Sequence, residues 1–436
     1  MKKNFTRRSF IQTSAVGLAG FTFFPLLNSC KQFGVNDTIR LGFIGLGQQT
    51  RYLINGFNLL AGVKVVAGSD VYGIKRERFE KTVKEFQREK EETVEVKTYE
   101  NYQDILERQD IDAVVIVTPD HWHAIQTLDA CRAGKDIYIE KPLAFTIKEG
   151  VAITNAVKNS DIILGVGSQQ RSDPRFQHAV KLVRDGKLGK INRINAFVGP
   201  PPRPFDLTEE TIPYDLDWEK WLGPNPFVHY NHRLNPPVSL DPVQNETFWA
   251  EWRYFKETGG GFLTDWGAHN FDIAQWAMNR DNSGPVKVIP AGVNGEDYIR
   301  FIYDDGIVMA NEPYNEEHTR GVKFWGEDGW VEICRANYKA SDPSFLPVAD
   351  DQAEEVPYET GIAHLVDFIE SMRSRRQPIA PVEAGHRSGT IGILGNIATN
   401  LNISLDWDPV EQRFPNDDEA NLQLHREYRE GYKLQA

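Results

Sequence analysis

The chain is poor in cysteine, in net positive charge and in long hydrophobic runs, and each shortage excludes a class of protein. Three cysteines occur in 436 residues, and only Cys131 and Cys334 lie beyond the first 30, which is too few for a disulfide framework or a thiolate metal cluster. The 62 acidic residues outnumber the 49 basic ones, and a net charge of −13 repels nucleic acid. Past residue 30, no apolar run reaches the length of a membrane span.

The N-terminal segment has the pattern of an export signal. Arg7 and Arg8 precede an apolar stretch of small residues that ends in Asn28, Ser29 and Cys30. Paired arginines before such a stretch are typical of the twin-arginine route, which carries folded proteins across the inner membrane. We expect residues 1–30 to be a signal and the protein to be exported to the periplasm. Cys30 is either a neighbour of the cleavage site or a lipidation site, and a lipid there would be the protein's only contact with the membrane.

Residues 38–168 alternate between apolar strand-like runs and amphipathic helical segments. Such alternation predicts a parallel, doubly wound α/β sheet, in which ligands bind at the carboxyl ends of the strands. The expected strands are 39–44, 63–67, 113–117, 136–139 and 162–166, and the expected helices are 50–60, 75–90, 102–108, 123–133 and 147–159.

A glycine-rich turn follows the first expected strand. Gly45 and Gly47 stand where a tight turn must let backbone amides approach a pyrophosphate at a helix N-terminus, and Gln48 is the next residue of that turn. The third glycine of the dinucleotide-binding fingerprint is replaced by Thr50, so the turn taken alone is also compatible with a purely structural role.

Asp70 ends the second expected strand, at the spacing of a residue that binds the ribose hydroxyls of a dinucleotide. A carboxylate there repels a 2′-phosphate, so the sequence favours NAD as the cofactor over NADP. The cations of Lys75 and Arg76 follow closely and moderate this preference.

Three residues form a candidate proton-handling group for the oxidation of an alcohol. Such a reaction needs a hydride acceptor and a base within reach of the hydroxyl. Lys141 follows a buried strand and faces the expected crevice, although a lysine at a strand end is often only a solvated charge. Asp265 and His269 are four residues apart after a glycine-rich turn, so on one helix they share a face and the carboxylate can orient the imidazole. Asp272 falls near that face and either binds a substrate hydroxyl or supports packing.

These motifs resemble the Gfo/Idh/MocA family of sugar and polyol oxidoreductases over nearly the whole chain past the signal. The resemblance implies an NAD(P)-binding Rossmann domain at 38–168. It also implies a substrate and oligomerisation domain at 169–436 with an open, predominantly antiparallel sheet, in a homo-oligomer such as a dimer or tetramer. The matching pieces are Ile44 to Gly47, Thr118 to His123, Glu140 to Ala144, Gly167 to Arg171 and Gly259 to Asp272, with Leu405 to Pro409, Asp417 to Asn421 and Arg426 to Glu430 in the tail.

The resemblance also implies roles for individual residues. It gives Lys141, Asp265 and His269 the catalytic proton handling. It extends the cofactor site from Gly45, Gly47, Gln48 and Asp70 to Thr118, Pro119, His123, Glu140 and Lys141. Because His121 and His123 are too close together to converge on a metal without further ligands, we expect no metal site.

Residues around the expected domain junction are candidates for binding the substrate. Gln170 and Arg171 follow the last strand of the first domain and either meet sugar hydroxyls or form a polar hinge. Trp266 and Asp272 complete the candidate set. Residues 199–252 are rich in proline and tryptophan, which suits an ordered insertion over the active-site mouth. Flat aromatic rings there would favour a glycoside over a small polyol.

The sequence therefore predicts an NAD(P)-dependent oxidoreductase that acts on a secondary hydroxyl of a sugar or glycoside. Our first hypothesis is reversible oxidation at C3, with a tightly bound cofactor, because the periplasm has no pool of reduced nicotinamide. One alternative is a glycoside hydrolase that oxidises C3 transiently so that the anomeric substituent is eliminated. Retention of Lys141 favours the dehydrogenase, since the hydrolase branch departs from Glu-Lys-Pro at this position. The other alternative is a sugar-binding lipoprotein without catalysis.

Overall fold

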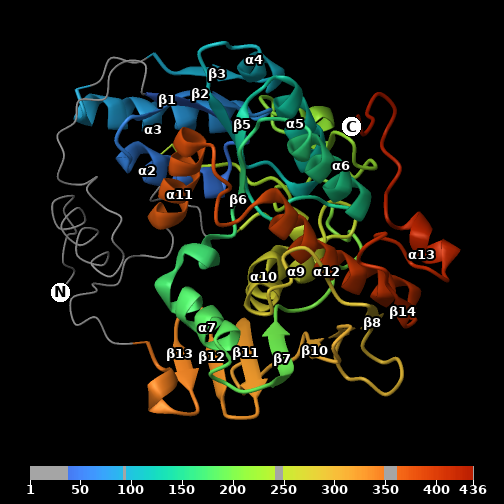
Figure 1. Ribbon diagram of the computed structural model, residues 1–436. Helices are drawn as coiled ribbons and strands as arrows, with labels where there is room; N and C mark the ends of the chain where they lie inside the picture. The colour runs from blue at the N-terminus through green and yellow to red at the C-terminus, as the bar shows by residue number, and fades with distance from the viewer. Residues whose placement is uncertain (1–37, 92–94, 241–248, 348–360, 436) are drawn as a thin grey trace.

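The computed structural model describes residues 38–91, 95–240, 249–347 and 361–435 (Figure 1). The predicted export signal and the lipidation candidate Cys30 lie outside these residues. In the part of the chain that is described, no helix is long and apolar enough to cross a membrane.

The first domain is built on a six-stranded sheet in the order β3-β2-β1-β4-β5-β6, with every pair parallel. This is the strand order of a dinucleotide-binding Rossmann sheet, as the alternating pattern predicted. All four residues of β4 and of β5 are buried, because helices cover both faces of a parallel sheet. The strands are β1 (Ile39–Ile44), β2 (Val63–Ser69), β3 (Lys97–Tyr99), β4 (Ala113–Ile116), β5 (Asp136–Ile139) and β6 (Leu164–Val166).

The helices of this domain follow the expected order, and three of them begin two or three residues earlier than expected. One starts directly after Gly47 and another directly after Pro119, so that both first turns lie at the carboxyl edge of the sheet. The capping box of Thr146 and Glu149 fixes the start of the last helix of this domain. The helices are α2 (Gln48–Leu59), α3 (Gly73–Glu89), α4 (Gln103–Leu106), α5 (Asp120–Arg132) and α6 (Ile147–Lys158).

Helix α11 (Ile362–Ser374) belongs to the C-terminal part of the chain but packs on the first sheet beside α2 (Figure 1). Leu365 and Phe368 of α11 share one apolar core with Phe43 and Phe57 of the Rossmann domain. The two domains are therefore interlocked, because residues beyond the predicted boundary at 168 contribute to the core of the first domain.

The second sheet has eight strands in the order β13-β12-β11-β7-β10-β9-β8-β14. Only β10 and β7 pair in parallel, so the sheet is predominantly antiparallel, as expected. The strands are β7 (Ile191–Phe197), β8 (Lys287–Ile289), β9 (Arg300–Ile302), β10 (Val308–Ala310), β11 (Gly321–Gly326), β12 (Trp330–Ile333), β13 (Tyr338–Ala340) and β14 (Leu405–Asp406).

One face of the second sheet is covered by helices, and the largest apolar core of the described chain lies between them and the strands. Helix α12 also contacts α6 and β6 of the first domain and thereby ties the two sheets together. The helices that pack with this sheet or complete the domain are η2 (Gln169–Ser172), α7 (Pro174–Arg184), α9 (Gly261–Asp265), α10 (Gly267–Ala277), η4 (Pro343–Phe345), α12 (Val382–Leu401) and α13 (Asp418–Leu422).

The insertion, which we define as residues 198–260 between β7 and α9, carries α8 (Trp218–Leu222) and η3 (Glu251–Tyr254). Its aromatic residues form a core of their own, which packs against Tyr72 at the start of α3. The tail, defined as residues 425–435, returns to the Rossmann domain, where Tyr432 packs edge-on against Trp122 with ring centres 5.7 Å apart. Insertion and tail therefore flank the carboxyl edge of the first sheet.

Candidate functional site

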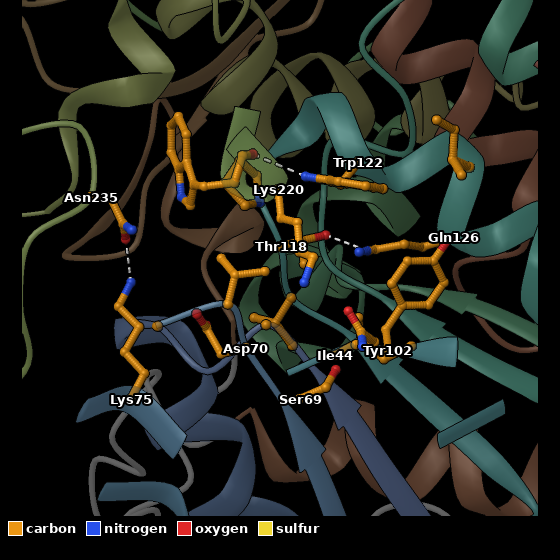
Figure 2. Close-up of a pocket in the computed structure, with 18 of the residues that line it drawn as sticks. Ile44, Ser69, Asp70, Lys75, Tyr102, Thr118, Trp122, Gln126, Lys220 and Asn235 are labelled. Carbon is orange, nitrogen blue, oxygen red and sulfur yellow. Dashed lines mark hydrogen bonds between the residues drawn. The ribbon is translucent and has the colours of Figure 1, made fainter. Parts of the chain in front are cut away.

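A cavity of about 430 Å³ opens at the carboxyl ends of β1 and β2 (Figure 2). Its walls come from the glycine turn, from the first turn of α5, from the insertion and from the tail. Among the predicted cofactor residues, the structure brings Gly45, Gly47, Gln48, Asp70, Thr118 and Pro119 together around this cavity.

The glycine turn has the geometry that a phosphate group requires. Gly45 has φ +87°, and a Cβ atom there would lie 2.7 Å from the backbone nitrogen of Thr118, so a side chain cannot be placed. A Cβ on Gly47 would meet no atom within 4 Å, which leaves open space above the backbone. Gly47 caps α2 without any side-chain hydrogen bond, so the first amides of this helix are not capped by a side chain and can face an anion.

Asp70 is held rigidly beside this turn. Its Oδ2 accepts a hydrogen bond from the backbone N–H of Leu46 at 2.8 Å, and its Oδ1 accepts one from the N–H of Tyr72 at 2.9 Å. Arg76 donates to the carbonyl oxygen of Asp70 rather than to its carboxylate. A fixed carboxylate at the end of β2 fits the predicted ribose-binding role and fits NAD without a 2′-phosphate.

Three residues predicted for the cofactor site, His123, Glu140 and Lys141, do not line the cavity, and the first two are buried in the surrounding loops. His123 is 1% exposed, and its two ring nitrogens lie 2.7 Å from the Pro142 oxygen and 2.9 Å from the Thr118 oxygen. Burial lowers the pKa of His123 to about 4, so the ring is neutral and its single N–H donates to one of these two carbonyl oxygens, while the ring packs between the two loops. Glu140 is buried too and accepts hydrogen bonds from Gln49 and Gln169. We therefore correct both assignments from cofactor contact to support of the loops.

Lys141 and Asp265 form an ion pair between the two domains. The Nζ atom of Lys141 lies 2.5 Å from Oδ1 of Asp265 and 3.2 Å from its backbone oxygen. A third group, Arg253 of the insertion, has its Nε 3.6 Å from the same carboxylate oxygen and also lines the cofactor cavity. Burial alone would raise the pKa of Asp265, but the charges of Lys141 and Arg253 outweigh it and the pKa lies below the usual value. Asp265 is therefore an anion that fixes the lysine.

His269 is buried beside this ion pair. Its Nδ1 atom is buried and has no hydrogen-bond partner among the described residues. Burial, reinforced by the charges of Arg335 and Lys141, places the pKa of His269 well below 6.5, so the imidazole is neutral at physiological pH. Trp266 packs edge-on against the ring at 5.9 Å. A neutral imidazole with an unused nitrogen is suited to accept a proton.

The structure corrects the predicted relationship between Asp265 and His269. Asp265 ends the short helix α9, and His269 lies in the following helix α10, with a break at Trp266. In the described chain no hydrogen bond joins the two side chains, since the carboxylate is engaged by Lys141. The carboxylate thus orients the lysine and not the imidazole.

The predicted substrate residues Gln170, Arg171 and Asp272 lie inside the protein. Arg171 is 1% exposed and donates to both carboxylate oxygens of Asp272 at 2.8 Å and to those of Asp281 at 2.7 and 3.0 Å. Gln170, also 1% exposed, donates to Asn270. Because these groups bind one another, we correct the assignment of Arg171 and Asp272 from substrate binding to a structural ion-pair network.

The insertion lies over the cofactor cavity. Trp249, Trp252 and Arg253 line the cavity, and Trp249 stacks on Tyr52 of α2 with ring centres 6.3 Å apart. The backbone N–H of Ala250 donates to Gln48 in the glycine turn. That the aromatic rings of the insertion also face the substrate stays a prediction.

Sequence reasoning missed several residues at the site. Asp120 begins α5 and is 3% exposed; burial, with the nearby charge of Asp265, raises its pKa to about 8. Asp120 belongs to the segment from Thr118 to His123, and its position directly before His121 was the signal that sequence reasoning could have used. Arg253, Asn235 and Tyr432 also line the cavity, but they come from the insertion and the tail, and no local pattern links them to the glycine turn.

Comparison with known proteins agrees with this arrangement. Residues 39–168 match the model of the Gfo/Idh/MocA oxidoreductase family's NAD-binding Rossmann fold, and residues 203–434 match the model of its C-terminal alpha/beta domain. A solved structure of levoglucosan dehydrogenase in complex with NADH and levoglucosan has a TM-score of 0.58 over 85% of this chain and 99% of that one, at 18% identity, and so shares the fold.

Curated relatives are similar over part of their length. Levoglucosan dehydrogenase of Pseudarthrobacter phenanthrenivorans is 38% identical over 61% of this chain and 66% of that protein. The scyllo-inositol 2-dehydrogenase (NAD(+)) of Bacillus subtilis is 32% identical over 38% of this chain and 47% of that protein. A glycosyl hydrolase family 109 protein of Shewanella sp. (strain ANA-3) is 31% identical over 33% and 35%. In all three, the match spans less than two thirds of the relative. Because the two family models together cover most of the chain, it belongs to the Gfo/Idh/MocA family of oxidoreductases.

Proposed function

We propose that the protein is an NAD-dependent oxidoreductase that oxidises a secondary hydroxyl of a sugar or glycoside. The observation that carries the proposal is the buried, unpartnered Nδ1 of a neutral His269 next to the Lys141–Asp265 ion pair. The names of two relatives, a levoglucosan dehydrogenase and an inositol dehydrogenase, support a sugar or polyol as the substrate.

In this reaction, different residues of the chain bind the cofactor, hydrogen-bond the substrate hydroxyl and accept its proton. Gly45, Gly47 and Asp70 would hold NAD, and bound NAD supplies the hydride acceptor. Lys141, held by Asp265, donates a hydrogen bond to the substrate hydroxyl and stabilises the negative charge that develops on its oxygen. His269 takes the hydroxyl proton as the hydride leaves, because its ring is neutral and one of its nitrogens is unused.

Oxidation at C3 of a glycoside, with hydride returned to a second sugar, is our preferred version of the reaction. A cofactor walled in by the insertion and the tail would exchange slowly, and a second keto-sugar would then have to restore its oxidation state. We expect the purified protein to carry NAD or NADH.

The test is to identify the nucleotide by mass spectrometry of freshly purified protein and then to follow the reduced-nicotinamide absorbance as glycosides and keto-glycosides are added. Reduction by a glycoside and reoxidation by a keto-glycoside are the expected results. Bound nucleotide that never changes its absorbance would favour a sugar-binding protein without catalysis. Loss of all nucleotide on desalting, with full activity in added NAD, would argue against retention.

The similarity to a glycosyl hydrolase family 109 protein favours a second candidate function, redox-assisted hydrolysis. In that reaction, oxidation at C3 acidifies the C2 proton and the anomeric substituent is eliminated before hydride returns. Release of the aglycone without net formation of NADH would support it. Oxidised sugar with the aglycone still attached would support the dehydrogenase.

Export and assembly remain proposals. We propose that the twin-arginine pattern directs the protein to the periplasm and that Cys30 carries a lipid there. Fractionation of cells that express the full chain and its Cys30→Ser variant tests both points.

We also propose a homo-oligomer formed on the face of the second sheet that carries Lys323 between Trp325 and Trp330. Light scattering of the purified protein reports the oligomeric state.

A further inference from the structure

Asn235, in the insertion, has a buried side-chain N–H group without a hydrogen-bond acceptor among the described residues. The residue is 2% exposed and lines the cofactor cavity. Its Oδ1 accepts a hydrogen bond from Lys75, but its Nδ2 is buried and has no hydrogen-bond partner among the described residues. A buried amide N–H group without an acceptor destabilises the folded protein, and an acceptor on a ligand in the cavity would relieve this penalty.

A neighbouring asparagine in the same insertion shows the contrast. The Nδ2 of Asn231 donates to the backbone oxygen of Thr208 at 2.9 Å and to Glu210 at 3.3 Å. Asn231 is buried as well, but it does not line the cavity. The open amide is therefore a property of the asparagine that faces the cavity and not of the insertion in general.

The position of Asn235 identifies the part of the cofactor it would meet. Figure 2 shows Lys75 and Asn235 joined by a hydrogen bond at one side of the cavity, next to Asp70. Asp70 marks the end of β2, where the adenosine ribose of a dinucleotide is bound in this fold. The ribose hydroxyls are the acceptors that the amide lacks.

The same contact restrains the cation that would otherwise attract a 2′-phosphate. Lys75 lies in the first turn of α3, is 7% exposed and lines the cavity beside Asp70. Its ammonium group donates to Oδ1 of Asn235, and the next cation, Arg76, donates to the backbone oxygen of Asp70. Both cations are thus directed to protein oxygens.

We infer that Asn235 determines the cofactor specificity of this protein: its amide N–H group binds the adenosine ribose of NAD, and its carbonyl oxygen holds Lys75 away from the site of a 2′-phosphate. The insertion thereby contributes a direct ligand to the cofactor. The first action stabilises bound NAD, and the second favours NAD over NADP because it removes a cation that would pair with a 2′-phosphate.

The experiment measures the dissociation constants of NAD⁺ and NADP⁺ by calorimetry on protein freed of nucleotide. The Asn235→Leu variant loses both the donor and the acceptor, so NAD⁺ should bind about tenfold more weakly while NADP⁺ binds more tightly to the released lysine. In Asn235→Asp the acceptor for Lys75 remains, so NAD⁺ binding should weaken without any gain for NADP⁺. The double variant Lys75→Met/Asn235→Leu should lose the gain for NADP⁺.

The matched control is Asn231→Leu, which removes a buried amide of the insertion that does not face the cavity. Its ratio of NADP⁺ to NAD⁺ dissociation constants should equal that of the unaltered protein. If Asn235→Leu does not fold, as judged by thermal unfolding, Asn235→Ser keeps a small side chain and serves in its place. Unchanged affinities for both nucleotides in the Asn235 variants would overturn the inference. Because no sugar is present, failure here is distinguishable from failure of the proposed oxidation.

Discussion

Lys141 and Asp265, 124 positions apart in the chain, form one ion pair across the junction of the two domains, with Nζ and Oδ1 2.5 Å apart. The lysine comes from the loop after β5 and the aspartate from the end of α9. The catalytic lysine that the sequence predicted is thus held in place by the substrate domain. Any relative movement of the domains would change the position of its ammonium group.

Replacement of Lys141 by methionine should abolish most of the activity without loss of cofactor. The side chain keeps its length but no longer donates to the substrate hydroxyl, so kcat should fall by roughly 10²–10⁴-fold. The nucleotide released per protein should stay as in the unaltered protein. The exposed Lys148 provides the control, since Lys148→Met removes a charge from the same region. A variant Lys141→Met with full kcat would exclude a role in catalysis.

His269 should act as a base down to an unusually low pH. Burial and the charges of Arg335 and Lys141 lower its pKa, so the ring stays neutral as the pH falls below 6.5. The rate of cofactor reduction in a single turnover, measured with saturating glycoside, should therefore show no loss between pH 8 and about 6.5. His269→Gln should remove the activity at every pH. An acid limb centred near 6.5 would mean that another, exposed histidine is the base.

Asp120 should make the protein less stable as the pH rises. Its pKa is near 3.8 when the chain is unfolded and is raised to about 8 by burial and by Asp265 in the folded protein. The folded state therefore binds more protons between these values, and the stability from Asp120 is complete below 3.8 and lost by about pH 8. The urea midpoint of Asp120→Asn should decline less over this range. Asp104→Asn, at an exposed position, should behave as the unaltered protein.

The buried network of Arg171 should contribute to stability and not to substrate affinity. Arg171→Met leaves the carboxylates of Asp272 and Asp281 without their partner, which should cost about 3–5 kcal/mol of unfolding free energy. KM for the sugar, measured on protein kept folded at low temperature, should change little. Arg175→Met breaks a surface pair with Asp173 and should cost less than about 1 kcal/mol. A large rise in KM with unchanged stability would restore the original assignment to the substrate site.

The parts of this protein that follow from local sequence were predicted well. The alternating apolar runs predicted the parallel sheet and five of its six strands, but not the short edge strand β3. The position of Asp70 follows from its spacing to Gly45. What failed depends on contacts between distant segments. Arg171 follows a strand and was expected to meet sugar hydroxyls or to form a polar hinge, yet it is buried and pairs with Asp272, 101 positions away. The helix break at Trp266, which separates Asp265 from His269, follows from how α9 and α10 pack and not from their composition.

The tail has a consequence for how the protein is made. Tyr432 and Gln435 line the same cavity as the glycine turn at Gly45. During synthesis the glycine turn leaves the ribosome almost 400 residues before this wall exists. A chain that is still being translated therefore lacks both this part of the wall and helix α11, which completes the apolar core of the Rossmann domain. The complete cavity wall exists only after Tyr432 has been added to the chain.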